Sequence, residues 1–143
     1  MLHNILPCGT NLKRWKIKES SICSICQIDQ DITHLLYTCR HVRHVWLRIN
    51  NVLARNVRAT HVIFGMEHDF NLNFIISLVS YIVYKEWILC EKNDIDRDNF
   101  NILGFISREL IYRHMIFKHM HWFDNNMQIM FEKVVEEIAN QVA

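Results

Sequence analysis

Glycine and proline are scarce in this chain, whose 143 residues include three glycines and one proline. Few positions therefore favour tight turns or interrupt helices, so long helices are expected. The chain also lacks any run of 18 uncharged apolar residues. Its most apolar stretch, residues 74–89, contains Lys85 and Glu86. This stretch predicts a buried helix rather than a membrane span.

The cysteines are too few and too unevenly placed for a disulfide scaffold. Five occur, an odd number, and three of them fall within residues 23–39. A secreted domain of this size would carry a denser, even set. No hydrophobic region typical of a signal peptide opens the sequence. We therefore expect a reduced, intracellular protein, nuclear or cytoplasmic, that does not associate with a membrane.

The most specific motif is Cys23-x2-Cys26-x7-His34-x4-Cys39. Three thiolates and one imidazole suit a tetrahedral shell around a zinc ion. The gap of two lets one tight turn present Cys23 and Cys26, and the gap of four places His34 and Cys39 near the end of a short helix. Four protein ligands leave no open position for water, so the motif predicts one structural zinc ion rather than a hydrolytic centre.

Other nearby donors compete with this ligand set. Cys8 lies close enough in sequence to be a rival ligand, and His41 or His44 could replace His34 as the fourth donor. The better interpretation of the two histidines is a polar helix face shared with arginines. Cys90 lies inside a hydrophobic helical pattern, which predicts a buried thiol.

Apolar residues recur at helical spacing over four longer stretches, residues 42–53, 72–92, 102–117 and 127–138. The second is apolar around much of its circumference, which is typical of the central helix of a bundle. Half of the residues are hydrophobic, enough to form a core. The predicted fold is mainly α, with an N-terminal CCHC zinc knuckle packed on a three- to four-helix bundle. The predicted division is a zinc-knuckle module with flanking helices at 1–54 and the helical bundle at 55–143.

Several shorter features complete this prediction. A short helix is expected up to Ile17, a knuckle loop over residues 18–32, and an extended piece over residues 61–65 that ends at a glycine. The polar residues expected to cap helices are Thr10, Thr33, Asp96 or Asp98, and Asp124 or Asn125.

Charge is unevenly spread although the net charge is only +1. Residues 1–62 hold nine Lys or Arg against three acids, a charge of +6, and residues 63–143 hold seven against twelve, a charge of −5. This asymmetry points to an anionic partner for the first half. Ordinary charge on helix surfaces is the alternative explanation.

Two further clusters of titratable residues argue weakly for an enzyme. The spacings of His114, His119 and His121 place them on no single helix face with Glu109. The acids Asp94, Asp96 and Asp98 are not accompanied by the glycine and the glutamate that a calcium loop requires. A polar helix end and a capped inter-helix loop explain them better. No glycine-rich phosphate loop, nucleophile elbow or Ser-His-Asp order is present, so we predict no catalytic residues.

The residues around the ligands resemble a known module, the zinc-binding C-terminal domain of non-LTR retrotransposon reverse transcriptases. The resemblance covers roughly residues 5–47. It rests on a Leu12-to-Ile17 segment that contains Trp15, the Cys23/Cys26 pair, the His34-to-Cys39 segment, and the Val45-Trp46 pair that follows. The polymerase motif Tyr/Phe-x-Asp-Asp and the Pro-Asp signature of the associated endonuclease are both missing.

This resemblance implies zinc ligation by Cys23, Cys26, His34 and Cys39. It also implies a non-catalytic module that grips template RNA or target DNA, single-stranded or structured, beside a polymerase domain or a second copy of itself. Basic residues near the knuckle are the candidate phosphate contacts, and Trp15, Tyr37 or Trp46 could stack on unpaired bases. Trp46 lies on the apolar stripe, which favours a core position. The rival hypothesis is a protein-interaction or self-association module with purely structural zinc. The candidate nucleic-acid contacts are Lys13, Arg14, Trp15, Lys16, Lys18, Arg40 and Arg43.

Overall fold

The computed structural model describes residues 6–140, and its elements are almost entirely helical. The described residues contain no β-strand, and an isolated antiparallel bridge joins Ile22 to Asp29. The prediction of a mainly α fold is therefore confirmed. In chain order the elements are α1 (Gly9–Arg14), the π-helical turn η2 (His34–Thr38), α2 (Arg40–Leu53), α3 (Ala59–Phe64), α4 (Phe70–Asn93), the 3-10 turn η3 (Arg97–Asn99), α5 (Ile102–His119) and α6 (Asn125–Ala139).

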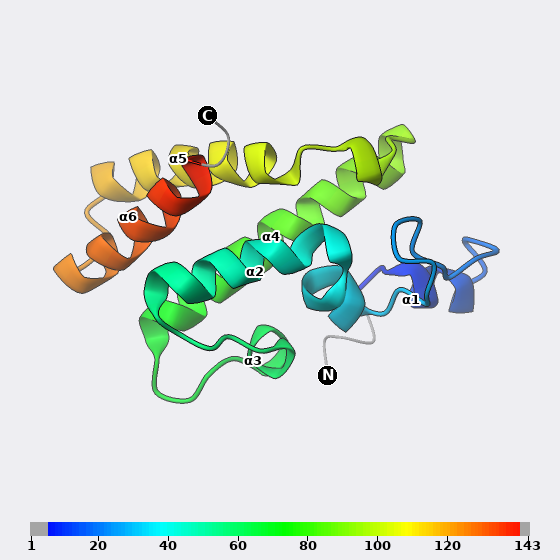
Figure 1. Cartoon of the computed structure of the whole chain (residues 1–143), viewed down its shortest axis with the longest axis horizontal. Helices are drawn as coiled ribbons and strands as arrows, with labels where there is room; N and C mark the ends of the chain where they lie inside the picture. The colour runs from blue at the N-terminus through cyan, green and yellow to red at the C-terminus, as the bar shows by residue number, and fades with distance from the viewer. Residues whose placement is uncertain (1–5, 141–143) are drawn as a thin grey trace.

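The four longer helices α2, α4, α5 and α6 form the bundle. α6 packs against both α5 and α2, and α4 packs against α5 (Figure 1). Their apolar stripes meet in one core that includes Trp46, Val79, Leu110 and Phe131. The same core continues into the knuckle through Leu35 and Cys39, both fully buried. Hydrophobic burial thus joins the metal-binding segment to the bundle.

α4 is the most apolar helix of the chain. Its length and composition alone would allow it to cross a membrane. The core helix of a globular bundle can have the same length and composition. Its residues from Leu72 to Cys90 are buried at ten positions, among them Ile82, Glu86 and Trp87. These residues pack inside the bundle, as predicted from the sequence.

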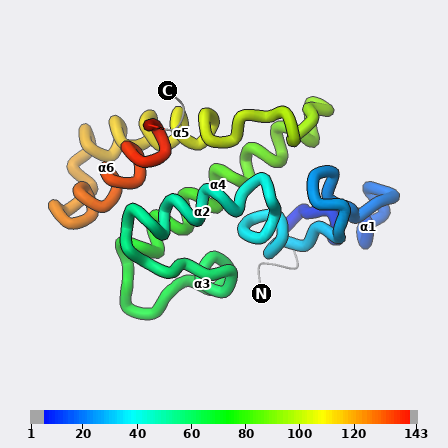
Figure 2. Tube along the Cα trace, in the orientation of Figure 1, coloured from blue at the N-terminus to red at the C-terminus, as the bar shows by residue number. Residues whose placement is uncertain are grey.

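The knuckle loop and α1 lie together at one end of the molecule (Figure 2). The backbone N–H of Thr10 donates to the carbonyl of Gln30 at 3.0 Å, and that of Gln30 donates to the carbonyl of Ser21 at 2.9 Å. A side chain at Gly9 would place its Cβ 2.5 Å from the Ser21 carbonyl oxygen. The close approach of α1 to the loop therefore requires glycine at this position.

The predicted extended piece at residues 61–65 is wrong. These residues belong to α3 and its C-cap, Gly65, whose φ of 81° ends the helix. A short apolar run does not separate a strand from a helical turn by its pattern.

Several predicted helix caps are also wrong. α1 begins at Gly9, before Thr10, and Asp31 rather than Thr33 accepts the His34 N–H, at 2.7 Å. Asp96 caps η3, whereas Asn101 caps α5 by accepting the Gly104 N–H. The predicted cap of α6 at Asp124 is present.

The boundary between predicted modules 1–54 and 55–143 stays a prediction. α2 lies on the N-terminal side of that boundary, and it packs against α5 and α6.

Candidate metal centre

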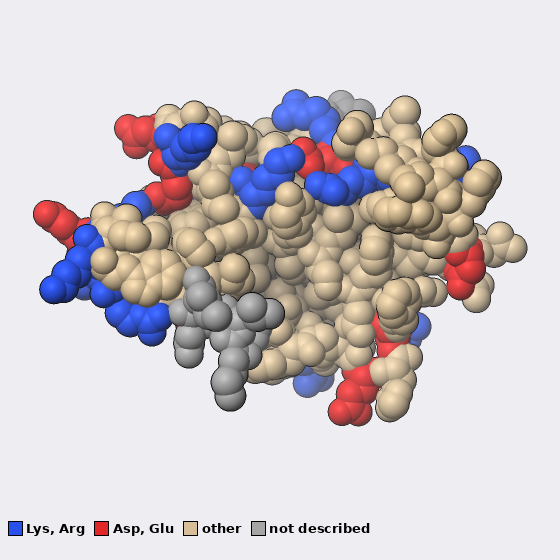
Figure 3. Space-filling model, turned by 180° about the vertical axis from the view of Figure 1, so that it is seen from behind, with Lys and Arg blue, Asp and Glu red and all other residues tan. Residues whose placement is uncertain are grey.

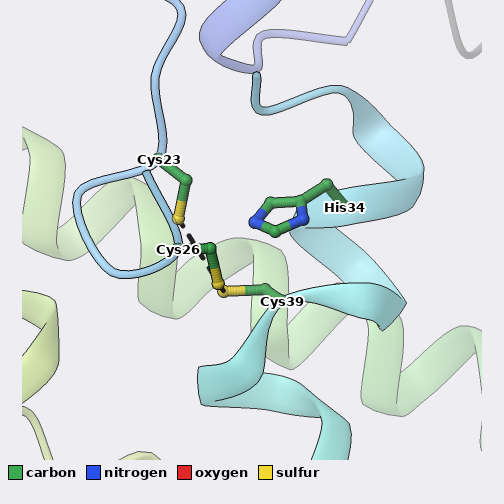
Figure 4. A group of neighbouring side chains, drawn as sticks. All are labelled: Cys23, Cys26, His34 and Cys39. Carbon is green, nitrogen blue, oxygen red and sulfur yellow. Dashed lines mark hydrogen bonds between the residues drawn. The ribbon is translucent and has the colours of Figure 1, made fainter. Parts of the chain in front are cut away.

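The four predicted ligands come from three adjacent segments. Cys23 and Cys26 lie in the knuckle loop, His34 opens η2, and Cys39 stands between η2 and α2 (Figure 4). The Gln27 N–H donates to the Cys23 carbonyl at 2.9 Å, which closes the turn that carries both thiols. The Cys39 N–H donates to the His34 carbonyl at 2.9 Å. These two backbone turns therefore bring the Cys23/Cys26 pair and the His34/Cys39 pair close together.

The distances between the ligand atoms fit a tetrahedral zinc site. The Cys39 Sγ lies 3.9 Å from the Cys23 Sγ and 3.8 Å from the Cys26 Sγ. Zn–S bonds of about 2.3 Å in a tetrahedron place two sulfurs about 3.8 Å apart, whereas a disulfide would hold them at about 2.0 Å. All four ligand atoms lie within 4.8 Å of one another. The spacing therefore matches one bound ion and no disulfide.

The His34 ring is held with one nitrogen turned toward the sulfurs (Figure 4). Its Nδ1 lies 3.3 Å from the Thr38 hydroxyl oxygen. Its Nε2 is buried and has no hydrogen-bond partner. A buried nitrogen without a partner is costly unless a ligand satisfies it, and a metal-bound histidine characteristically hydrogen-bonds through its other nitrogen. Nε2 is thus the donor that suits a zinc ion.

The thiols also have the electrostatics of a metal site. The hydrogen bond with Cys39 lowers the pKa of the Cys23 thiol to about 4, and the same hydrogen bond raises the pKa of Cys39. The Arg40 N–H donates to the Cys26 Sγ at 3.3 Å. Zinc binds thiolates, so it would take the place of the shared proton. The four donors fit one structural zinc ion, which when bound crosslinks the loop to η2 and α2.

The rival donors lie outside this cluster. Cys8 is buried with its Sγ 3.4 Å from the Thr10 hydroxyl. The Nε2 of His41 lies 3.4 Å from the Oε1 of Glu86, so this ring faces the carboxylate. Burial lowers the pKa of His44. Cys90 is a buried thiol, as predicted, and burial raises its pKa to about 12.

The two other clusters considered in the sequence do not converge. Glu109 pairs with Lys85 and Arg113, whereas His114 accepts a hydrogen bond from Gln128 at 2.8 Å. Among residues 6–140 the Cys-Cys-His-Cys set is the group of His, Cys, Asp and Glu whose donor atoms converge as metal ligands would.

A buried ionic network beneath the site was missed in the sequence. Glu86 on α4 is fully buried and receives the Arg97 guanidinium through two bonds, at 3.1 and 2.7 Å. Burial alone would raise the pKa of Glu86, but the neighbouring His41 ring and the hydrogen-bonded Arg97 guanidinium hold that pKa below its usual range. The available signal was an acid within the apolar run of α4. The partner could not be predicted because Arg97 lies in the short 3-10 turn η3, where the sequence has no apolar periodicity that would place its side chain.

The candidate nucleic-acid contacts fall into two groups. Residues 13–18 are all exposed, with Trp15 at 38% and Ile17 at 67%. Figure 3 shows Lys and Arg side chains at the end of the molecule that carries α1, interspersed with acidic side chains, and further Lys and Arg side chains elsewhere on the same face. Lys18, however, pairs with Glu91, and Arg40 lies 3.6 Å from Asp98. Trp46 is 1% exposed and belongs to the core.

The comparisons with known proteins concern this end of the chain. Residues 1–46 match the family described as zinc-binding in reverse transcriptase. No curated protein and no solved structure matches the chain. The matched segment contains all four clustered donors. Residues 1–46 therefore fit a zinc-binding domain of the reverse-transcriptase type.

Proposed function

We propose that this zinc-stabilised module binds RNA or DNA, single-stranded or structured, without catalysing a reaction itself. The observation that carries the proposal is the exposed segment Lys13-Arg14-Trp15-Lys16-Ile17-Lys18 beside the metal centre. Cations in such a segment attract phosphates, and an exposed indole stacks on an unpaired base. The family match adds support because reverse transcriptases act on nucleic acid.

The phosphate contacts that we infer are fewer than the sequence predicts. Lys18 and Arg40 already have acidic partners within the chain. No acidic oxygen of the described residues lies within 4.0 Å of Lys13, Lys16 or Arg43. These three residues would give about three phosphate contacts. For a single strand, log K should then fall with log salt with a slope of about −2.

Fluorescence anisotropy with a labelled single strand over a range of salt tests this proposal. Lys13→Gln/Lys16→Gln should weaken binding and reduce the steepness of the salt dependence by about 1.4. Lys118→Gln/Lys133→Gln removes the same charge from exposed lysines of the second half and should change little. Failure to bind RNA or DNA at low salt would reject the proposal.

A second candidate function is protein interaction or self-association, with zinc purely structural. Exposed apolar side chains at the end of α5 favour it: Tyr112 is 64% exposed, Met115 66% and Met120 48%, and all three line one surface hollow. Contiguous apolar surface of this kind commonly marks a protein contact. Concentration-dependent sedimentation that Met115→Lys abolishes, together with no nucleic-acid binding, would favour this candidate.

A further inference from the structure

A pocket beside the metal centre has a mixed apolar and cationic lining. It has a volume of about 300 Å³ and is lined by Tyr37, Thr38, Arg43, Trp46 and Leu47. Tyr37 and Thr38 end η2, and the other three residues lie on the first turns of α2. Their spacing of three and four places Arg43, Trp46 and Leu47 on one helix face.

The apolar wall of this pocket is held rigidly. The rings of Tyr37 and Trp46 lie with centroids 5.9 Å apart and planes inclined by 30°. The Trp46 indole N–H donates to the Leu36 carbonyl at 2.7 Å, and the Tyr37 hydroxyl donates to the Val57 carbonyl at 2.8 Å. Both polar groups are therefore satisfied within the protein. Trp46 is 1% exposed and closes the floor of the pocket, so the half-buried Tyr37 ring is the aromatic surface that an occupant can reach.

The remaining lining residues include a cation. Arg43 is exposed, and no acidic oxygen of the described residues lies within 4.0 Å of its guanidinium. Leu47 is 53% exposed at the rim. A purely apolar occupant would leave this cation without a partner. A flat ring attached to an anion would use both parts of the lining, because arginine binds phosphate and aromatic rings stack on bases.

We propose that this pocket, formed by Tyr37, Thr38, Arg43, Trp46 and Leu47, holds one unpaired base of a nucleic-acid strand, with Arg43 on the neighbouring phosphate. The inference rests on the proposed function and adds a site for the base to it. It places a base contact on η2 and α2, separate from the exposed segment at residues 13–18. Because Cys39 joins these two elements, a bound metal would hold the pocket in shape.

The experiment compares two labelled strands of equal length on the full-length, zinc-loaded protein at low salt. One is oligothymidylate and the other has the same backbone with abasic sites throughout. Phosphate contacts are common to both, so the difference reports on base contacts alone. The strand with bases should bind about tenfold more tightly. Leu47→Gln should remove most of this preference, whereas Leu89→Gln, at another surface leucine on α4, should retain it.

The possible outcomes separate the pocket from the function on which it rests. Equal binding of the two strands would overturn the pocket and leave the proposed function standing. An undiminished preference in Leu47→Gln would also overturn the pocket, provided that the variant unfolds at the wild-type denaturant concentration. No binding of either strand would overturn both.

Discussion

Gly9 occupies a position where the knuckle loop leaves no room for a side chain. Its Cα faces the backbone of Ser21, and a Cβ would also lie 3.0 Å from the Cβ of Gln30. Neither contact can be relieved by rotating a flexible side-chain end. The Gly9 N–H donates to the Gln30 side-chain oxygen at 3.2 Å. A shift of α1 would break this hydrogen bond, which holds the knuckle loop against α1.

Gly9→Ala should therefore destabilise the protein by roughly 1–3 kcal/mol, as overpacking does. The measurement is denaturant unfolding of the zinc-loaded protein. Gly104→Ala is the matched control. Its Cβ would meet only the side-chain end of Asn101, at 2.9 Å. The gain in helix propensity, about 1 kcal/mol, should roughly offset the weakened cap. Equal stability of Gly9→Ala and wild type would contradict the close approach.

Helices were predictable from the sequence wherever an apolar stripe ran for several turns. The stripe from Val42 to Leu53 became α2, and the run from Leu72 became α4, each within two residues of the expected start. α3 was not predictable because its six residues contain one short apolar run, residues 62–64, which fits a strand as well as a helical turn. The true cap of α5, Asn101, was hidden because two aspartates nearer to α4 offered equivalent signals.

The scarcity of glycine did not prevent left-handed turns. Six other residues within the described range 6–140 have positive φ, among them Gln27 in the knuckle turn and the helix caps Ala54 and Asp94. Such a residue costs roughly 1–2 kcal/mol relative to the right-handed region. The chain thus ends α2 at Ala54, with a φ of 49°, where glycine is the usual residue.

Ala54→Gly should stabilise the protein by up to about 1 kcal/mol, because relief of the left-handed strain exceeds the extra entropy of glycine in the unfolded chain. Asn51→Gly, on the exposed side of the same helix, should destabilise it because that backbone is regular helix. Thermal unfolding of both variants distinguishes them. A less stable Ala54→Gly would contradict the observed cap.

In the whole molecule, part of the charge asymmetry is neutralised by ion pairs between the two halves of the chain. Basic residues of the first half pair with acids of the second in four places: Lys18 with Glu91, Arg40 with Asp98, Arg48 with Glu137, and Arg55 with Asp69. The +6 charge of the first half is therefore not all available to bind an anionic partner, because part of it is paired with the −5 charge of the second half. Each exposed pair adds little stability, so the pairing chiefly reduces the charge left for a ligand.

The buried pair Glu86–Arg97 is different from these surface pairs. Arg97→Met leaves the Glu86 carboxylate buried without its main partner and should cost roughly 3–5 kcal/mol. The double variant Glu86→Leu/Arg97→Met removes both charges and should be clearly more stable than Arg97→Met. Denaturant unfolding of both variants measures the difference. A double variant as unstable as Arg97→Met would show that packing, not charge, dominates at this site.

Metal content tests the zinc site most directly, because Cys23, Cys26, His34 and Cys39 were identified as a set by spacing and are brought together by the fold. Elemental analysis of purified protein should find about one zinc per chain. Cys8→Ser and Cys90→Ser, at buried thiols outside the cluster, should retain it. Cys23→Ser and Cys39→Ser should lose it, with loss of amide protection over residues 10–50 in hydrogen exchange. Full zinc occupancy in both of these variants would contradict the assignment.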